Sequence, residues 1–114
     1  MTTGTSGQTH LSSVQIDVLR QELQEQLARR RGHLAGLQEA ASEGTGADET
    51  WQELSVSIVT ADRAVGELTQ ALDRLAEGGY GRCAECEAAI PFERLKIRPL
   101  ARYCIACQRR HEAA

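Results

Sequence analysis

Aromatic side chains are scarce in this sequence of 114 residues and make up only 4% of it. They are Trp51, Tyr80, Phe92 and Tyr103. A β-sandwich or a β-barrel usually needs more large side chains to fill its core, and a surface that stacks nucleic-acid bases needs several exposed rings. The composition therefore argues against these two fold classes and against a base-stacking surface.

The patterns that mark membrane proteins and common enzymes are also missing. No stretch approaches the roughly 18 apolar residues of a membrane span. The sequence has no glycine-rich phosphate loop, no Ser/His/Asp set and no H-E-x-x-H motif. Residues 1–10 are polar, without the apolar segment of a signal peptide. We therefore expect a cytoplasmic protein that is not an enzyme, with its cysteines in a reducing compartment.

All four cysteines fall in two pairs of C-x-x-C spacing, Cys83 with Cys86 and Cys104 with Cys107. Each pair places two sulfurs on one tight turn, and two facing turns form a four-thiolate zinc site. The alternatives are two disulfides or a redox C-x-x-C motif. A reducing compartment and the lack of a βαβ pattern argue against both. We predict one structural zinc ion on these cysteines, with no open position for catalysis.

Two long stripes of apolar or small residues precede the cysteines. The first follows a capping box at Ser12 to Gln15, is interrupted by Arg30, and consists of Ile16, Leu19, Leu23, Leu27, Leu34, Leu37 and Ala41. The second is regular and ends before Gly78; it consists of Trp51, Leu54, Ile58, Ala61, Val65, Leu68, Leu72 and Leu75. Both stripes have the spacing of amphipathic helices, and their leucines are core residues.

The glycine-containing segment 42–47 predicts a turn between these helices. Two such helices must bury their stripes against each other, which predicts an antiparallel coiled-coil hairpin. A parallel dimer through the second helix is the alternative, but it leaves the first stripe uncovered. The predicted fold class is mainly α, and we expect a monomer. Residues 1–11 form a disordered tail, 12–78 the coiled-coil hairpin, and 79–114 the zinc-finger module with a short C-terminal helix.

Inside the module, Pro91 and Pro99 prevent a continuous helix between the cysteine pairs. Four apolar side chains are expected to form a small core around the metal: Ile90, Leu95, Ile97 and Leu100.

Charge is unevenly distributed along the chain, whose net charge is −3. Between Arg31 and Arg63 there is no lysine or arginine, so the far end of the hairpin is acidic. The zinc module is mildly basic. An acidic run is often only a solvated face. Its position at a projecting tip favours a role in binding a basic channel or a metal ion.

The sequence from Gly79 to Cys86, followed by Ile90-Pro91, Arg98-Pro99 and Cys104 to Gln108, resembles the DksA/TraR family of bacterial transcription factors. Members bind RNA polymerase and insert a coiled coil into its secondary channel, in some cases together with the alarmone ppGpp. The resemblance implies a regulator of initiation with Cys83, Cys86, Cys104 and Cys107 as zinc ligands. It implies no sequence-specific DNA binding and no membrane association.

The resemblance also implies polymerase-facing residues at the tip, here Glu39, Glu43, Asp48 and Glu49. This tip departs from the Asp-x-x-Asp-x-Ala motif of the best-known members. Candidate contacts to ppGpp or polymerase are Arg94, Lys96 and Arg98. Glu87 stands where a glycine usually follows the second cysteine, so we expect a changed turn there.

Two other functions stay open from the sequence. One is a nucleic-acid-binding zinc protein that uses the basic module, although the net charge and the few aromatic residues argue against it. The other is a zinc-stapled adaptor that binds another protein through the hairpin.

Overall fold

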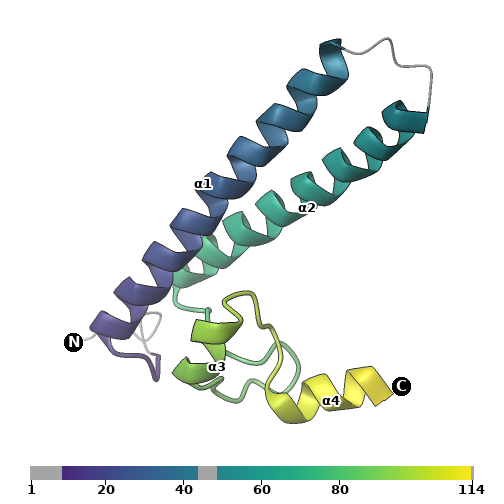
Figure 1. Ribbon diagram of the computed structural model, residues 1–114. Helices are drawn as coiled ribbons and strands as arrows, with labels where there is room; N and C mark the ends of the chain where they lie inside the picture. Colours follow the sequence, from purple (N-terminus) through teal and green to yellow (C-terminus); the bar gives the residue numbers. More distant parts are fainter. Residues whose placement is uncertain (1–8, 44–48, 114) are drawn as a thin grey trace.

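The computed structural model describes residues 9–43 and 49–113, which form a helical hairpin with a small module at its base. Helices α1 (Ser13–Glu43) and α2 (Glu49–Glu77) run antiparallel, and α3 (Phe92–Ile97) and α4 (Ile105–Ala113) lie in the module (Figure 1). The molecule measures 59 × 35 × 20 Å. Its radius of gyration is 17.7 Å, whereas a compact domain of this length has about 13 Å. The predicted fold class, a mainly α protein with a long hairpin, is confirmed.

The hairpin begins at a residue that caps the start of α1 and ends at a glycine that terminates α2. At the start of α1, the Ser12 hydroxyl accepts from the Gln15 N–H and the Gln15 side chain accepts from the Ser12 N–H, both at 3.0 Å. This is the predicted capping box. At the end of α2, Gly78 has φ 93°. It lets three successive N–H groups, those of residues 78–80, reach the carbonyl of Arg74.

The predicted seam is buried at the base of the hairpin and opens toward the tip. On α1 the buried positions are Leu19, Leu23 and Leu27; on α2 they are Ala61, Leu68, Ala71 and Leu75. Beyond Leu27, Leu34 and Leu37 are only partly buried, and Trp51 is 39% exposed. Arg30 occupies the seam position where this change occurs, and its side chain is exposed. Burying the charged guanidinium group without a partner would be costly, so Arg30 stays in contact with water. The tight packing of the seam therefore ends at this position.

The base of the hairpin and the module share one apolar core. Tyr80, Ile90 and Leu95 from the module side join the seam leucines, and Leu11 completes the cluster at 6% exposure. His10 also contacts the module, because its Nε2 lies 2.6 Å from the carbonyl oxygen of Ile90. The assignment of the whole segment 1–11 to a disordered tail was therefore wrong for residues 9–11, which pack against the module. Residues 1–8 lie outside the described part.

Inside the module, no continuous helix joins the cysteine pairs within the described residues, as expected from the two prolines, whereas the small core differs from the expectation. A short helix, α3, forms between the two prolines, with Pro91 at its N-cap position. Ile97 was expected in the small core and is 81% exposed. Two residues along a helix rotate the side chain by about 200°, so burial of Leu95 directs Ile97 outward. In the described ranges, no helix combines the length and apolar character needed to cross a bilayer.

Candidate metal centre and adjoining surfaces

The two cysteine pairs sit on turns that aim backbone N–H groups at sulfur. In the first turn, the Cys86 N–H donates to Cys83 Sγ at 3.5 Å; in the second, the Cys107 N–H donates to Cys104 Sγ at 3.5 Å. The first turn is closed by a hydrogen bond from the Cys83 N–H to the Ala88 carbonyl at 2.8 Å. The second begins just before α4, whose first turn contains Cys107.

The four sulfur atoms have the geometry that a tetrahedral metal requires. They all lie within 4.8 Å of one another, and Cys86 Sγ and Cys104 Sγ are 3.7 Å apart. Four sulfurs around zinc at about 2.3 Å are separated by roughly 3.8 Å. Cys83 and Cys107 are buried, whereas Cys86 is exposed. All four are free cysteines, not disulfides. The donor set and its spacing fit zinc, and within residues 9–43 and 49–113 the ligand group consists of these four sulfurs.

Hydrogen bonding and burial act differently on the individual thiols. Burial opposes ionisation of Cys83, but donors that include the Cys86 and Cys104 N–H groups lower its pKa to about 6. The Cys107 N–H lowers the pKa of Cys104. Burial raises the pKa of Cys107 to about 12. Because thiolates are the metal ligands, zinc binding must overcome the cost of ionising the buried Cys107 thiol.

Arg110 offsets this cost and was not identified from the sequence. Its Nη2 donates to Cys107 Sγ at 2.9 Å, and its positive charge favours the thiolate. A four-thiolate zinc centre carries a net charge of −2, which a neighbouring guanidinium partly neutralises. Arginine three residues after a ligand on a helix is the only sequence signal for this role, and solvated arginines share that spacing.

A second contact holds α4 against the first cysteine turn. His111 Nε2 lies 2.6 Å from Glu85 Oε1, and the His111 ring is 4.4 Å from that of Tyr103. The two cysteine turns are therefore held together by the contact between His111 and Glu85 as well as by the contact between the sulfurs of Cys86 and Cys104.

Glu87, singled out in the sequence because glycine is usual there, has φ 66°. This is the left-handed region, which costs a residue with a Cβ roughly 1–2 kcal/mol. The Glu87 N–H nevertheless donates to the Cys83 carbonyl at 3.0 Å, so the turn closes. The turn keeps the shape that glycine would adopt, and Glu87 adopts it with strain.

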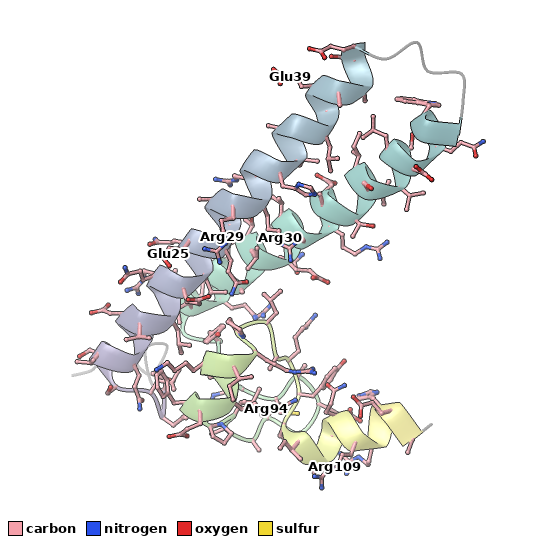
Figure 2. The ribbon with its side chains drawn as sticks, in the orientation of Figure 1. Glu25, Arg29, Arg30, Glu39, Arg94 and Arg109 are labelled. Atoms are coloured by element: carbon pink, nitrogen blue, oxygen red, sulfur yellow. The ribbon has the colours of Figure 1, made fainter. Side chains whose placement is uncertain are left out.

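The tip residues are only partly described. Glu39 and Glu43 are exposed at the distal end of α1, and Figure 2 shows Glu39 near that end. Asp48 lies outside the described residues. Glu49 is the first residue of α2, but its side chain is also outside the described part.

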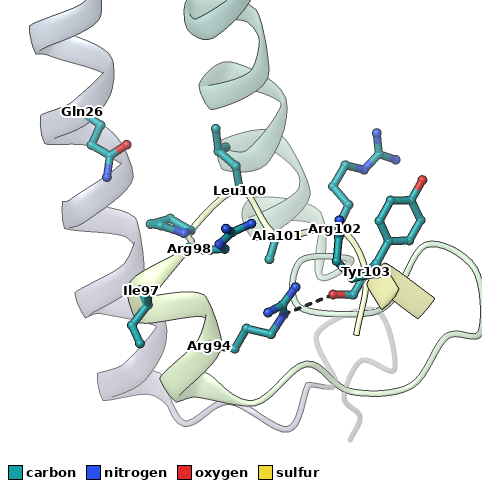
Figure 3. A pocket seen from close by; sticks show the side chains of 10 residues that line it. Gln26, Arg94, Ile97, Arg98, Leu100, Ala101, Arg102 and Tyr103 are labelled. Atoms are coloured by element: carbon teal, nitrogen blue, oxygen red, sulfur yellow. Dashed lines mark hydrogen bonds between the residues drawn. The ribbon is translucent and has the colours of Figure 1, made fainter. Parts of the chain in front are cut away.

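The basic candidates are brought together in part. A cavity of about 480 Å³ beside α3 is lined by Arg94, Arg98 and Arg102, with Gln26 of α1 on the opposite wall (Figure 3). Arg94 is held by a 3.3 Å hydrogen bond from its Nε to the Tyr103 carbonyl. Lys96 is exposed and does not line this cavity. Arg102 was not among the predicted candidates.

Comparisons with known proteins connect this centre to one family. Residues 78–113 match the family described as "Prokaryotic dksA/traR C4-type zinc finger". Two relatives, from two strains of Caulobacter vibrioides, are named "RNA polymerase-binding transcription factor DksA" and are each 36% identical over 61 residues. The match covers 51% of this chain and 43% of each relative, so the chain spans less than half the length of these relatives.

The solved structure of transcription factor DksA2 from Pseudomonas aeruginosa resembles nearly the whole chain. The TM-score is 0.81 at 25% identity, over 91% of this chain and 88% of that one. The likeness therefore includes the hairpin as well as the zinc module.

Proposed function

We propose, because residues 78–113 match the prokaryotic dksA/traR family of C4-type zinc fingers, that the chain is a non-enzymatic transcription regulator that binds RNA polymerase. The observation that supports this best is the combination of a long hairpin with a four-cysteine module at its base. The overall fold, hairpin included, is similar to that of a solved transcription factor over most of both chains. A single zinc-finger match would not by itself imply the hairpin.

The metal centre has a structural role in this proposal. One zinc ion, when bound by Cys83, Cys86, Cys104 and Cys107, would cross-link the two turns of the module. The apolar core common to module and hairpin would then fix the direction in which the hairpin projects. The cysteines thereby determine where the tip lies relative to the base.

The hairpin is suited to enter the secondary channel of the polymerase. α1 has 31 residues, which corresponds to about 46 Å of helix. We propose that the tip leads, with Glu39, Glu43, Asp48 and Glu49 as its acidic residues. In a narrow channel with little water, a carboxylate acts on a catalytic metal or a mobile loop more strongly than on an open surface.

The cavity lined by arginines is the candidate site for ppGpp or for a polymerase contact. Arginine presents a planar fork of donors that matches phosphate and carboxylate groups. Arg94 and Arg98 line this cavity, where they could contact such a group, and Arg102 supplies a third guanidinium. Lys96 remains a candidate only for a contact outside the cavity.

Polymerase binding is tested by incubating the zinc-loaded protein with purified core RNA polymerase and measuring the complex by native mass spectrometry. We expect a one-to-one complex. A protein that stays unbound at micromolar concentrations would contradict the proposal.

The role of the tip is tested by open-complex lifetime in a purified transcription assay. Glu43→Gln with Asp48→Asn should abolish the effect while polymerase affinity changes by less than a few-fold. The control, Asp73→Asn with Glu77→Gln, makes the same charge change near the base of α2 and should behave as the parent. If the tip variant still regulates like the parent, the carboxylates are not the effector groups.

A further inference from the structure

A second basic surface lies on α1, away from the cysteines and from the tip. Gln26, Arg29, Arg30 and His33 line a cavity of about 570 Å³ along this helix. Residues at this spacing share one face of a helix, because they fall within about 100° around its axis. Gln26 also lines the cavity of Arg94, Arg98 and Arg102, so this one side chain is common to both cavities. We call the combined surface, from Arg29 and Arg30 through Gln26 to these three arginines, the basic groove.

The arginines of the basic groove have no acidic partners in the part of the chain that the structure describes. The ion pairs there are Arg20 with Asp17 and His111 with Glu85. Neither cavity has an aspartate or a glutamate in its described lining. Figure 2 shows Arg29 and Arg30 midway along α1 and Arg94 on the module. Glu67 lines another cavity with Arg102, and Glu112 lines one with Arg94 and Arg98, whereas Arg29 and Arg30 line a cavity without a carboxylate among the described residues.

The carboxylates closest in sequence are occupied by other groups. Glu22 accepts a 2.8 Å hydrogen bond from the Gln26 amide, and Glu25 accepts one of 3.2 Å from the Gln21 amide. Glu25 stands four residues before Arg29, the spacing at which a helix commonly forms an ion pair. No such pair forms here, so Arg29 remains available to a partner.

We propose that the basic groove is a docking surface for a carboxylate-rich helical or extended segment of another protein. The partner must be anionic, because the groove offers guanidinium donors and no acceptor charge. The residues that line the α1 cavity follow one another at steps of three and four along the helix. Carboxylates on one face of a partner helix have the same spacing. This surface lies away from the tip. Its module half is also the candidate site for ppGpp or a polymerase contact, so the test changes only Arg29 and Arg30, which belong to the α1 half.

A nucleic-acid backbone is the competing anion and is less well matched. The chain carries a net charge of −3, which repels a dense polyanion at long range. The α1 cavity is lined, where the structure describes it, by no phenylalanine, tyrosine or tryptophan, and the aromatic rings of the basic groove are those of His33 and Tyr103. Acidic protein segments need no stacking surface.

The test measures fluorescence anisotropy of a fluorescein-labelled peptide of ten glutamates with the zinc-loaded full-length protein at low salt. Arg29→Gln with Arg30→Gln should weaken binding about fivefold, the effect expected for loss of two exposed ion pairs. The control is Arg31→Gln with Arg63→Gln. Both arginines are exposed and line neither cavity, and the change in net charge is the same.

The expected result is binding of the peptide that the groove variant weakens and the control variant leaves within about twofold. Equal losses in the two variants would show a general charge effect and overturn the proposal. So would an absence of peptide binding. Tighter binding of a labelled ten-residue oligothymidine, with loss in the groove variant, would assign the groove to nucleic acid instead. Circular dichroism of each variant at 222 nm checks that the helices are intact.

Discussion

Replacing Glu87 by glycine should tighten zinc binding, because the left-handed turn after Cys86 would no longer strain a Cβ. The φ of 66° costs a non-glycine residue roughly 1–2 kcal/mol. Part of this gain is offset, by about 0.5–1 kcal/mol, because glycine loses more conformational freedom on folding than a residue with a side chain does. The net gain is roughly 0–1.5 kcal/mol, with a middle value of about 0.75 kcal/mol that corresponds to an affinity about three- to fourfold higher. The turn must form for Cys83 and Cys86 to bind together, so the gain appears in metal affinity.

The assay is competition for zinc against a chromophoric chelator at neutral pH. Ala88→Gly is the matched control, because Ala88 is the next residue, is exposed and has no positive φ. It should weaken zinc binding by about two- to fivefold, since the flexibility of glycine is then uncompensated. Glu87→Gln removes the charge and keeps the Cβ, and should stay within about twofold of the parent. If Glu87→Gly weakens binding as much as Ala88→Gly does, the assignment of strain to this turn is refuted.

The remaining predictions concern the seam, the metal's neighbour and the buried phenol. Leu23→Ala should lower the free energy of unfolding by about 2–5 kcal/mol in urea titrations, and Leu37→Ala, in the open half of the seam, by less than half as much; equal losses would contradict the graded packing. Arg110→Met should weaken zinc affinity by roughly tenfold in the chelator assay, and unchanged affinity would show that its contact with sulfur is incidental. Burial raises the pKa of Tyr80 to about 12, so the folded state should lose stability as the pH rises from about 10 toward 12. The Tyr80→Phe variant should lose less stability over that pH range. At pH 7 it should be less stable than the parent, because the Pro99 carbonyl loses its 2.7 Å hydrogen-bond donor. Thermal melting of both proteins as a function of pH measures the two effects.

The parts of the fold that depend on local sequence were predictable. Capping at Ser12 and Gln15 and termination at Gly78 are decided within one helical turn, and both have the expected hydrogen bonds. The antiparallel hairpin followed because two apolar stripes in one chain need each other for burial. The spacing of the cysteines likewise fixes which sulfurs share a turn, and the structure brings the two turns together.

The parts that depend on packing between distant segments were not predictable. Residues 9–11 look like a polar tail with one leucine, and they are ordered because His10 and Leu11 reach the module around Gly81. A Cβ on Gly81 would lie 3.2 Å from His10 Cε1. Such a contact joins residues about seventy positions apart, and no periodicity in the sequence records it.

Sequence alone determined the two long helices and the four sulfur donors, because each depends on residues a few positions apart; the turn predicted at 42–47 lies mostly outside the described residues. Tertiary structure decided which charges meet. It placed Arg110 on Cys107, left Lys96 outside the arginine cavity, and joined Arg29 and Arg30 to that cavity through Gln26. The physical reason is that hydrogen bonds and burial along a helix are local, whereas the distance between two exposed charges is set by how the module docks against the hairpin.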